Sequence, residues 1–180
     1  RAVQPGERLN IMGPLGKGFA LPEADQPALL VAGGVGIAPL HLLARRLSEQ
    51  GRPVTVLWGG ASREAVDLGM ETSWPLLEAT MDGSIGYQGM VTDLLVRFLE
   101  QEGNIPWVGS CGPEPMLRQV ARVCASKGVA VQLCFEARMA CGWGVCLGCA
   151  VAVKDGQGSV SYKRVCSDGP VFWGHELTEW

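Results

Sequence analysis

Four cysteines near the C-terminal end constrain this chain more than any other feature. Their spacing is Cys141-x4-Cys146-x2-Cys149-x16-Cys166. This is the plant-ferredoxin type of spacing, in which four thiolates hold a 2Fe–2S cluster. Three sulfurs must then converge from one loop that folds tightly back on itself, and the fourth arrives from the far side of a hairpin. The spacing predicts an iron–sulfur site whose metal ligands are these four residues.

The residues between the ligands fit the same interpretation. Gly142, Gly144 and Gly148 lie between the cysteines, where we expect positive φ and a close approach of the backbone to the cluster.

Three other interpretations of the cysteines stay open at this point. A zinc site usually pairs two C-x2-C knuckles, and only Cys146 and Cys149 form one here. A thioredoxin-like motif is a single C-x2-C pair, so it does not explain the third and fourth cysteines. A disulfide framework is typical of a small secreted protein, whereas this chain has seven cysteines, an odd number, and enough apolar residues for a large core.

Composition excludes several classes of protein. The chain has 180 residues, of which 47% are hydrophobic and 18% charged, so we expect a folded domain. A net charge of -3 without a basic stripe argues against binding to nucleic acid. The longest charge-free stretch, residues 28–44, is interrupted by glycines and a proline, so we expect no membrane-spanning helix. No signal peptide is recognisable either.

Residues 28–135 alternate between short apolar runs and amphipathic runs. We expect helices from about residue 39 to Gly51, over 91–99 and over 113–127. Strands are expected at 28–32, 54–58, 76–80, 105–109 and 129–133. This alternation predicts an α/β fold with a five-stranded parallel sheet covered by helices on both faces.

The chain divides into three parts on this basis. Residues 1–27 are rich in turns and bury too little to fold alone, residues 28–135 form the α/β domain, and residues 136–180 form a small subdomain dense in cysteine and glycine. Within the last part, a hairpin is expected from strands at 151–153 and 160–162.

A glycine-rich turn joins the first expected strand to the first expected helix. It contains Gly33, Gly34, Gly36 and Pro39. Glycines at this place let a backbone approach a pyrophosphate, and the free N–H groups of the helix start face it. The pattern is not G-x-G-x-x-G, so a tight turn without a ligand is the alternative.

Two further turns, at 80–89 and 109–113, follow the ends of other expected strands, and ligands bind at that edge of open α/β sheets. Cys111 is therefore expected near a ligand, with a packing cysteine as the alternative. Cys124 and Cys134 are expected to be small buried hydrophobic residues.

These features occur together, and with them the chain resembles the electron-transfer subunit of B-type dihydroorotate dehydrogenase, in the ferredoxin-NADP reductase superfamily. The matching stretches are residues 13–19, 33–40, 110–117, 136–142 and 165–172, with the remaining cluster cysteines. The resemblance implies a 2Fe–2S cluster, NAD and FAD as cofactors. The FAD-binding β-barrel of the family is largely absent from this chain, and residues 1–27 look like its last strand and a linker.

The resemblance also implies roles and partners. Cys111, Gly112 and Pro113 would lie near the nicotinamide, and the glycine turn near the pyrophosphate. Electrons from dihydroorotate oxidation, in the pyrimidine pathway, would reach NAD⁺ through the cluster and FAD. The implied partner is a catalytic FMN-containing dihydroorotate dehydrogenase subunit, in a heterotetramer in the cytoplasm.

No catalytic residue is expected in the chain itself, since it contains neither a persuasive Ser–His–Asp arrangement nor a pair of catalytic carboxylates. It would be an oxidoreductase only as part of a complex. Ser62 and Arg63 follow the second expected strand, where the 2′-phosphate of NADP would bind. The resemblance nevertheless favours NAD. Alternative functions are the small flavin and 2Fe–2S subunit of an NADH-dependent ferredoxin:NADP reductase or of a hydrogenase, and a non-enzymatic zinc-binding module.

Overall fold

Uninterrupted apolar runs form the centre of the molecule. The computed structural model describes residues 3–21, 26–67, 69, 72–101 and 107–177. Its main sheet has seven strands in the order β4-β3-β2-β1-β5-β6-β9. They are β1 (Ala28–Gly33), β2 (Val54–Gly60), β3 (Leu76–Thr80), β4 (Tyr87–Gln88), β5 (Trp107–Cys111), β6 (Val131–Cys134) and β9 (Val171–Trp173). Every residue of β1, β5 and β6 is buried, as expected for strands covered on both faces.

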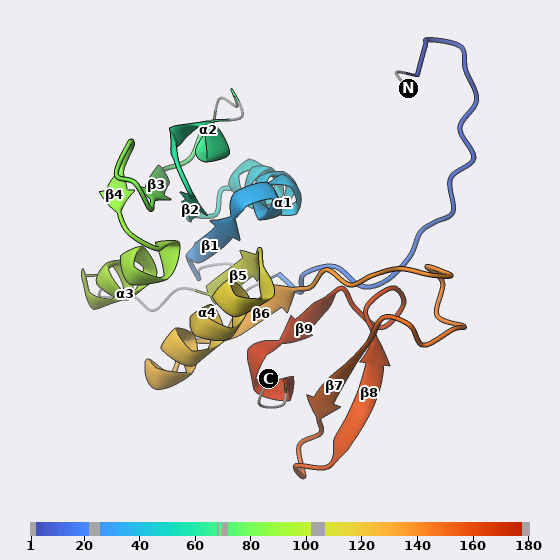
Figure 1. The fold of residues 1–180 in the computed structure, drawn as a ribbon. Helices are drawn as coiled ribbons and strands as arrows, with labels where there is room; N and C mark the ends of the chain where they lie inside the picture. Colours follow the sequence, from blue (N-terminus) through green and yellow to red (C-terminus); the bar gives the residue numbers. More distant parts are fainter. Residues whose placement is uncertain (1–2, 22–25, 68, 70–71, 102–106, 178–180) are drawn as a thin grey trace.

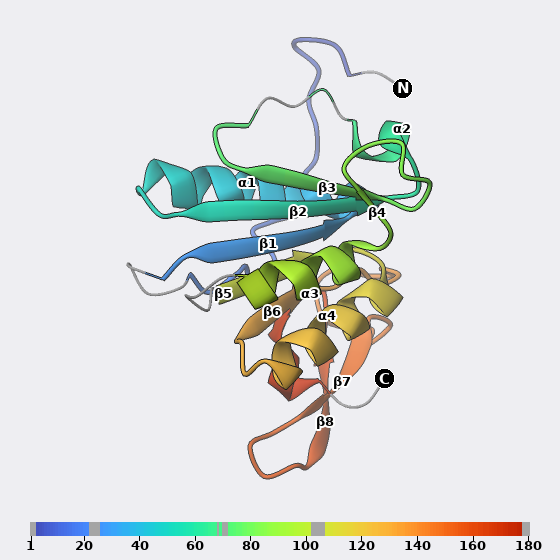
Figure 2. The same ribbon diagram turned by 90° about the vertical axis from the view of Figure 1, so that its left-hand side faces the viewer.

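Helices cover both faces of this sheet (Figures 1 and 2). The helix α1 (Ile37–Glu49) lies on one face, and α3 (Val91–Gln101) and α4 (Glu114–Ser126) lie on the other, with a short α2 (Arg63–Val66) after β2. Two 3-10 turns, η1 (Gly34–Gly36) and η2 (Gly174–Glu176), complete these elements. The apolar side of α1 is buried as its periodicity predicts, through Leu40, Leu43, Ala44 and Leu47. No helix in the described part of the chain combines the length and the apolar character needed to span a bilayer.

The predicted α/β fold with a parallel sheet is confirmed, and the five predicted strands correspond to β1, β2, β3, β5 and β6. The fourth is described from Trp107 onward, because residues 105 and 106 lie outside the described residues. The sequence missed β4 and β9. The first is only two residues long, and β9 pairs antiparallel with β6 and buries Phe172, so part of the cysteine-rich segment returns to the main sheet.

The predicted hairpin forms a separate two-stranded sheet of β7 (Ala150–Lys154) and β8 (Val160–Arg164). Its antiparallel register pairs Ala150 with Arg164 and Lys154 with Val160. The Asp155 carboxylate closes the turn by accepting hydrogen bonds from the backbone N–H groups of Gln157 and Ser159. The strand pairing holds the start of β7 and the end of β8 side by side.

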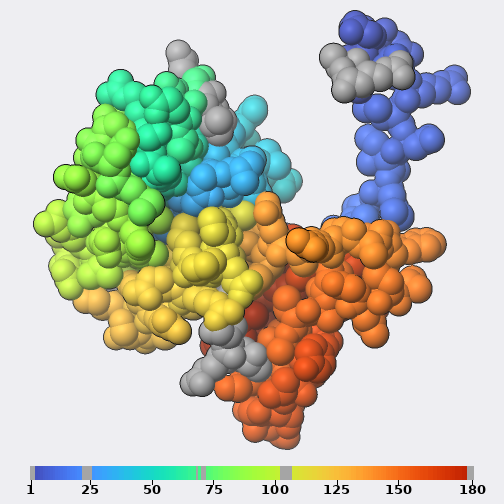
Figure 3. Space-filling model, in the orientation of Figure 1, coloured from blue at the N-terminus to red at the C-terminus, as the bar shows by residue number. Residues whose placement is uncertain are grey.

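The N-terminal segment is extended and projects from the body before it docks (Figure 3). Ile11 is 84% exposed, whereas the segment just after it reaches the sheet. The buried Gln132 side chain exchanges two hydrogen bonds of 2.9 Å with the backbone of Ala20. Phe19 packs edge-on against Trp107, and Lys17 bridges to Pro170. This segment therefore holds the end of β6 and the C-terminal part of the chain together.

The turn after β1 packs directly on the turn after β5. A Cβ atom at Gly36 would lie 2.2 Å from the Cys111 carbonyl oxygen, and one at Gly112 would lie 3.0 Å from the Gly33 backbone. Trp58 Nε1 donates a hydrogen bond of 2.9 Å to the Gly34 carbonyl and fixes the same turn. The close approach that these glycines permit is thus between two backbone turns of the sheet edge.

This packing predicts the effect of Gly36→Ala. Gly36 has an ordinary helical φ of -59°, so alanine strains no dihedral, and the whole cost comes from the collision with the Cys111 carbonyl. Overpacking of this kind costs about 1–3 kcal/mol of unfolding free energy. Urea denaturation measures it, with Gly156→Ala as the control, because a Cβ at Gly156 meets nothing within 4 Å. Equal stability of the two variants would show that the turns are not packed in this way.

Candidate functional site

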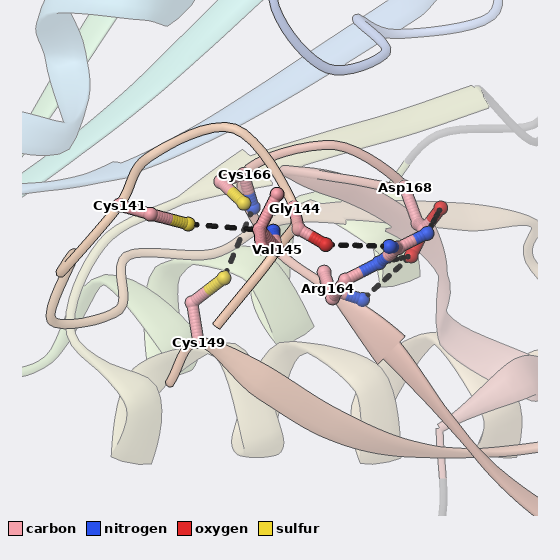
Figure 4. A network of polar contacts seen from close by, with 7 residues as sticks. All are labelled: Cys141, Gly144, Val145, Cys149, Arg164, Cys166 and Asp168. Atoms are coloured by element: carbon pink, nitrogen blue, oxygen red, sulfur yellow. Dashed lines mark hydrogen bonds and ion pairs between the residues drawn. The ribbon is translucent and has the colours of Figure 1, made fainter. Parts of the chain in front are cut away.

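The β7–β8 hairpin brings cysteines of the C-terminal motif together, and Figure 4 shows three of them, Cys141, Cys149 and Cys166. Cys141 and Cys146 lie on the loop that precedes the hairpin, Cys149 stands immediately before β7, and Cys166 comes two residues after the end of β8. Antiparallel pairing continues past the strands, because the Val165 N–H donates to the Cys149 carbonyl at 3.0 Å. The long gap in the spacing is therefore the length of one hairpin, which returns the fourth sulfur to the other three.

Backbone N–H groups point at three of the sulfurs. Val145 donates to Cys141 Sγ at 3.4 Å, Gly148 to Cys146 Sγ at 3.4 Å, and Cys166 to Cys149 Sγ at 3.5 Å. Hydrogen bonds of this kind favour the charged thiolate. The loop supplies the donors that a metal-binding thiolate cage needs.

Positive φ angles allow the loop to fold inward, but not at every predicted position. Gly142 and Gly144 have φ of 74° and 92°, as expected. The expectation is wrong for Gly148, which does not adopt positive φ; Leu147 does so instead, with φ of 59°. A non-glycine residue in this region is uncommon and concentrates at functional loops. The strain falls on Leu147, in the middle of the C-x2-C segment.

Two of the thiols are made more acidic by these donors. The backbone N–H groups of Trp143, Cys146 and Val145 lower the pKa of Cys141 to about 6. The backbone N–H of Cys166 lowers the pKa of Cys149. Burial, with the neighbouring Cys149 thiol, raises the pKa of Cys166 instead. The site thus holds two thiols with lowered pKa values beside one whose pKa is raised.

The sulfurs interact two by two. Cys141 interacts with Cys146, and Cys149 with Cys166. Within the residues that the structure describes, no three His, Cys, Asp or Glu side chains are arranged to hold a single metal ion. A 2Fe–2S cluster binds two thiolates on each of its two irons, so paired ligands fit it better than they fit one tetrahedral zinc ion. All seven cysteines are free, so the structure contains no disulfide between them.

A buried hydroxyl supports the same fit. Among the described residues, Ser167 Oγ has no hydrogen-bond partner, although it is buried next to Cys166 and against Gly144. A buried polar group without a partner is costly and calls for an explanation. A sulfur-rich group held by the four cysteines would give this hydroxyl an acceptor.

A second candidate site is a cavity of about 720 Å³ at the carboxyl edge of the main sheet. Its walls come from the ends of β1 and β2, from the loop before α3, and from the starts of α3 and α4. The lining residues are Gly33, Gly34, Gly59, Gly60, Ala61, Ala65, Met81, Gly89, Met90, Val91, Thr92, Asp93, Pro113, Pro115, Met116 and Gln119. This is where open α/β sheets bind nucleotides.

The residues predicted to bind the dinucleotide are not all in this cavity. Gly33, Gly34 and Pro113 line it. Gly36 and Gly112 are packed between the two turns, and Pro39 is exposed on α1. A role of these residues in cofactor binding stays a prediction. Sequence reasoning missed the contributions of Gly59, Gly60 and the start of α3, although glycines directly after a strand were an available signal.

Cys111 lies beneath the turns, opposite a second thiol. It pairs in register with Cys134 on the neighbouring parallel strand, and both are buried. The hydrogen bond between the two thiols raises the pKa of Cys111 and lowers that of Cys134. Cys111 is therefore a neutral thiol. Cys124 is buried as expected, and burial raises its pKa to about 12.

The loop after β2 places the Arg63 cation between Ser62 and Glu64. Ser62 Oγ donates to Glu64 Oε2 at 2.6 Å, which lowers the pKa of Glu64. Asp82, on the adjacent loop, also has a lowered pKa, because the Ser84 hydroxyl donates to it at 2.6 Å. Ser62, which the sequence offered as a reader of a 2′-phosphate, thus already has a carboxylate as its partner.

Comparison with known proteins covers the cysteine site directly. A family described as the iron-sulfur cluster binding domain of dihydroorotate dehydrogenase B matches residues 136–178. A curated protein of Caldanaerobacter subterraneus subsp. tengcongensis, named dihydroorotate dehydrogenase B (NAD(+)), electron transfer subunit, is 39% identical over 97% of this chain and 68% of its own length. A homolog of that subunit from Aquifex aeolicus is 44% identical over 93% of this chain and 64% of its own length.

Solved structures show the same fold. The structure of an NADH-dependent reduced ferredoxin-NADP oxidoreductase matches with a TM-score of 0.78 and 33% identity, over 94% of this chain and 60% of that one. The ferredoxin reductase of carbazole 1,9a-dioxygenase matches with a TM-score of 0.53 and 21% identity, over 62% of this chain and 37% of that one. The chain spans about two thirds of the length of the curated relatives it matches. On the identity and coverage of those relatives, it belongs to the family of dihydroorotate dehydrogenase B electron transfer subunits.

Proposed function

We propose that this chain is the electron-transfer part of a dihydroorotate dehydrogenase B and passes electrons between a catalytic partner and NAD⁺. The arrangement of four free thiols in two pairs, at the 2Fe–2S spacing and with N–H donors on three of the sulfurs, carries this proposal. The four cysteines lie within residues 136–178, which match the iron–sulfur cluster binding domain of that enzyme.

Each part of the chain has a defined task in this proposal. Cys141, Cys146, Cys149 and Cys166 would hold the metal, and the cavity at the sheet edge would hold the dinucleotide. A bound 2Fe–2S cluster would supply one-electron transfer, which a flavin converts to the two-electron chemistry of NAD⁺. The described residues before β1 form an extended segment rather than a barrel, so FAD belongs to the proposal for the whole protein. The apolar lining at Met81, Val91 and Met116 would exclude water from the nicotinamide end.

The partner in this proposal is an FMN-containing subunit that oxidises dihydroorotate to orotate for pyrimidine synthesis, in a cytoplasmic heterotetramer. The loop around the four cysteines supports contact with a protein, because its side chains Met139, Trp143, Val145 and Leu147 are exposed and apolar. A surface that delivers single electrons must let the two redox groups approach closely. The chain therefore catalyses a reaction only as part of a complex.

A second function has some structural support. The 33% identity to the NADH-dependent reduced ferredoxin-NADP oxidoreductase is consistent with the small subunit of such an enzyme. The curated relatives named as electron transfer subunits are more similar, at 39% and 44% identity to the two described above. Identification of the co-purifying subunit separates the two functions: an FMN-containing dehydrogenase supports the first, and a larger iron–sulfur flavoprotein the second.

The metal site predicts the effect of Cys149→Ser. Loss of one thiolate removes a ligand from a buried position, so we expect the anaerobically purified variant to lose its visible absorption and most of its iron and sulfide. Cys124→Ala is the matched control, because this buried cysteine lies in α4, outside the site. A Cys149→Ser protein with stoichiometric iron and sulfide and an unchanged spectrum would contradict the ligand assignment.

The carboxylates of the loop after β2 predict selectivity for NADH over NADPH. A 2′-phosphate placed there would meet the Glu64 carboxylate and the nearby Asp82, with the Arg63 cation beside them. Glu64→Gln should therefore tighten the binding of NADPH relative to NADH by up to about fivefold, the scale of one exposed charge interaction. Titration calorimetry with both nucleotides measures this ratio, with Glu49→Gln on α1 as the control. An unchanged ratio would show that the ribose lies elsewhere.

The exposed apolar loop predicts where the partner binds. Trp143→Ser should weaken binding of the catalytic subunit at least about fivefold, because truncating an aromatic anchor at an interface costs more than about 1 kcal/mol. Iron content should not change, since Trp143 contributes only its backbone N–H to Cys141. Leu42→Ser, an equally exposed apolar residue on α1, is the control. If Leu42→Ser disrupts the complex and Trp143→Ser does not, the partner binds the other face.

A further inference from the structure

Arg164 connects the two segments that carry the cysteines (Figure 4). It is the last residue of β8, two positions before Cys166. Its Nη1 donates to the Gly144 carbonyl at 2.7 Å, on the three-cysteine loop. Its Nε and Nη2 donate to the two carboxylate oxygens of Asp168, at 2.8 and 3.1 Å. One guanidinium thus spans from the turn after β8 to the loop between the first two cysteines.

The geometry of this ion pair is fixed from several directions. The Asp168 carboxylate also accepts a hydrogen bond of 2.8 Å from the Arg164 backbone N–H. The backbone N–H groups of Asp168 and Gly169 donate to the Arg164 carbonyl at 2.8 and 3.0 Å. Both side chains are about two-thirds buried. A two-point contact between a guanidinium and a carboxylate is directional as well as strong, so the two charges have defined positions.

The chain segments that contain Gly144 and Arg164 approach each other closely. A Cβ atom at Gly144 would lie 2.7 Å from Ser167 Oγ and 3.4 Å from Arg164 Nη1. Only glycine fits there without displacing a neighbour, and its φ of 92° favours glycine as well. The guanidinium is therefore held against the loop that bears the cysteines.

Both charged groups lie next to the cysteines. Arg164 and Asp168 are each two residues from Cys166, one on either side of it along the chain. The guanidinium also donates to the Gly144 carbonyl, between Cys141 and Cys146. A cation and an anion thus lie in fixed places beside the site that the four cysteines form.

We propose that Arg164 and Asp168 are positioning residues that set the reduction potential of the cluster held by the four cysteines. This rests on the proposed function, in which the cysteines hold a 2Fe–2S cluster. Reduction by one electron adds one negative charge to the site. The Arg164 cation favours that charge and the Asp168 anion opposes it, and the net charge around a cluster is one of the factors that set its potential. The ion pair keeps these two opposing influences in balance.

A purely structural role makes a different prediction. If the pair served only to hold the loop, then removal of either partner would break the same contact and change the site in the same way. If the charges act on the cluster, removal of the cation must lower the midpoint potential, and removal of the anion must raise it. The sign of the shift therefore separates the two roles.

The test uses the full chain with its cluster reconstituted under anaerobic conditions. Arg164→Gln, Asp168→Asn and Arg164→Lys are compared with the wild type by iron and sulfide content and by an EPR-monitored redox titration at one pH. We expect a more negative midpoint for Arg164→Gln, a more positive one for Asp168→Asn, and for Arg164→Lys a midpoint closer to wild type than that of Arg164→Gln. Arg45→Gln on α1 removes the same charge from an exposed pair with Glu49 and should leave the midpoint unchanged.

Each outcome has a defined meaning. Shifts of the same sign in Arg164→Gln and Asp168→Asn, or no shift in either with full iron content, overturn the inference. If Arg164→Gln fails to retain its cluster, Asp168→Asn decides, because an unchanged or more negative midpoint is incompatible with the role of the anion. A wild-type chain that takes up no iron and sulfide contradicts the proposed function itself, which distinguishes that failure from a failure of the inference.

Discussion

The antiparallel pairing of β7 with β8 is the interaction on which the metal site depends. Without it, Cys149 and Cys166 are separated by a hairpin's length of chain. With it, the Val165 N–H reaches the Cys149 carbonyl and the Cys166 N–H reaches the Cys149 sulfur. The loop that carries Cys141 and Cys146 can then fold against the hairpin, whose two ends are already joined. The pairing of β7 with β8 therefore contributes to the site as directly as the sulfurs do.

The hairpin is in turn fixed to the main sheet. The chain leaves the sheet at the end of β6 and returns to it as β9, which pairs with β6. The Phe135 N–H donates to the Pro170 carbonyl at 2.9 Å, and Phe135 packs against Phe172. The cysteine-bearing excursion thus begins and ends on one strand. Because β6 neighbours β5, and Pro113 just after β5 lines the cavity, both candidate sites are connected to the main sheet through adjacent strands.

The sequence predicted what local patterns and spacing determine, and missed what only the folded chain brings together. Apolar runs identified the five main strands, and the cysteine spacing identified the hairpin. The strand β9 escaped because it is three residues long and gains its burial from β6. The role of Arg164 escaped for a related reason: an arginine four residues before an aspartate is ordinary until a turn pairs the two and places the guanidinium against Gly144. The glycine turn after β1 was identified correctly, but its sequence could not reveal that Gly36 faces Cys111 rather than open space.

The local environment of each of the seven cysteines determines whether its thiol ionises readily or stays protonated. At Cys141, backbone N–H donors on an open loop lower the pKa to about 6. At Cys124, burial among apolar side chains without such donors raises it to about 12. A metal competes with protons for thiolates. Iron would therefore bind the thiols of the loop rather than those of the core, although the core also contains cysteines. In Cys111 and Cys134 the thiols satisfy each other across two strands. Selectivity for three of the four sulfurs therefore comes from where the backbone directs its N–H groups, and the hairpin places the fourth, Cys166, beside them.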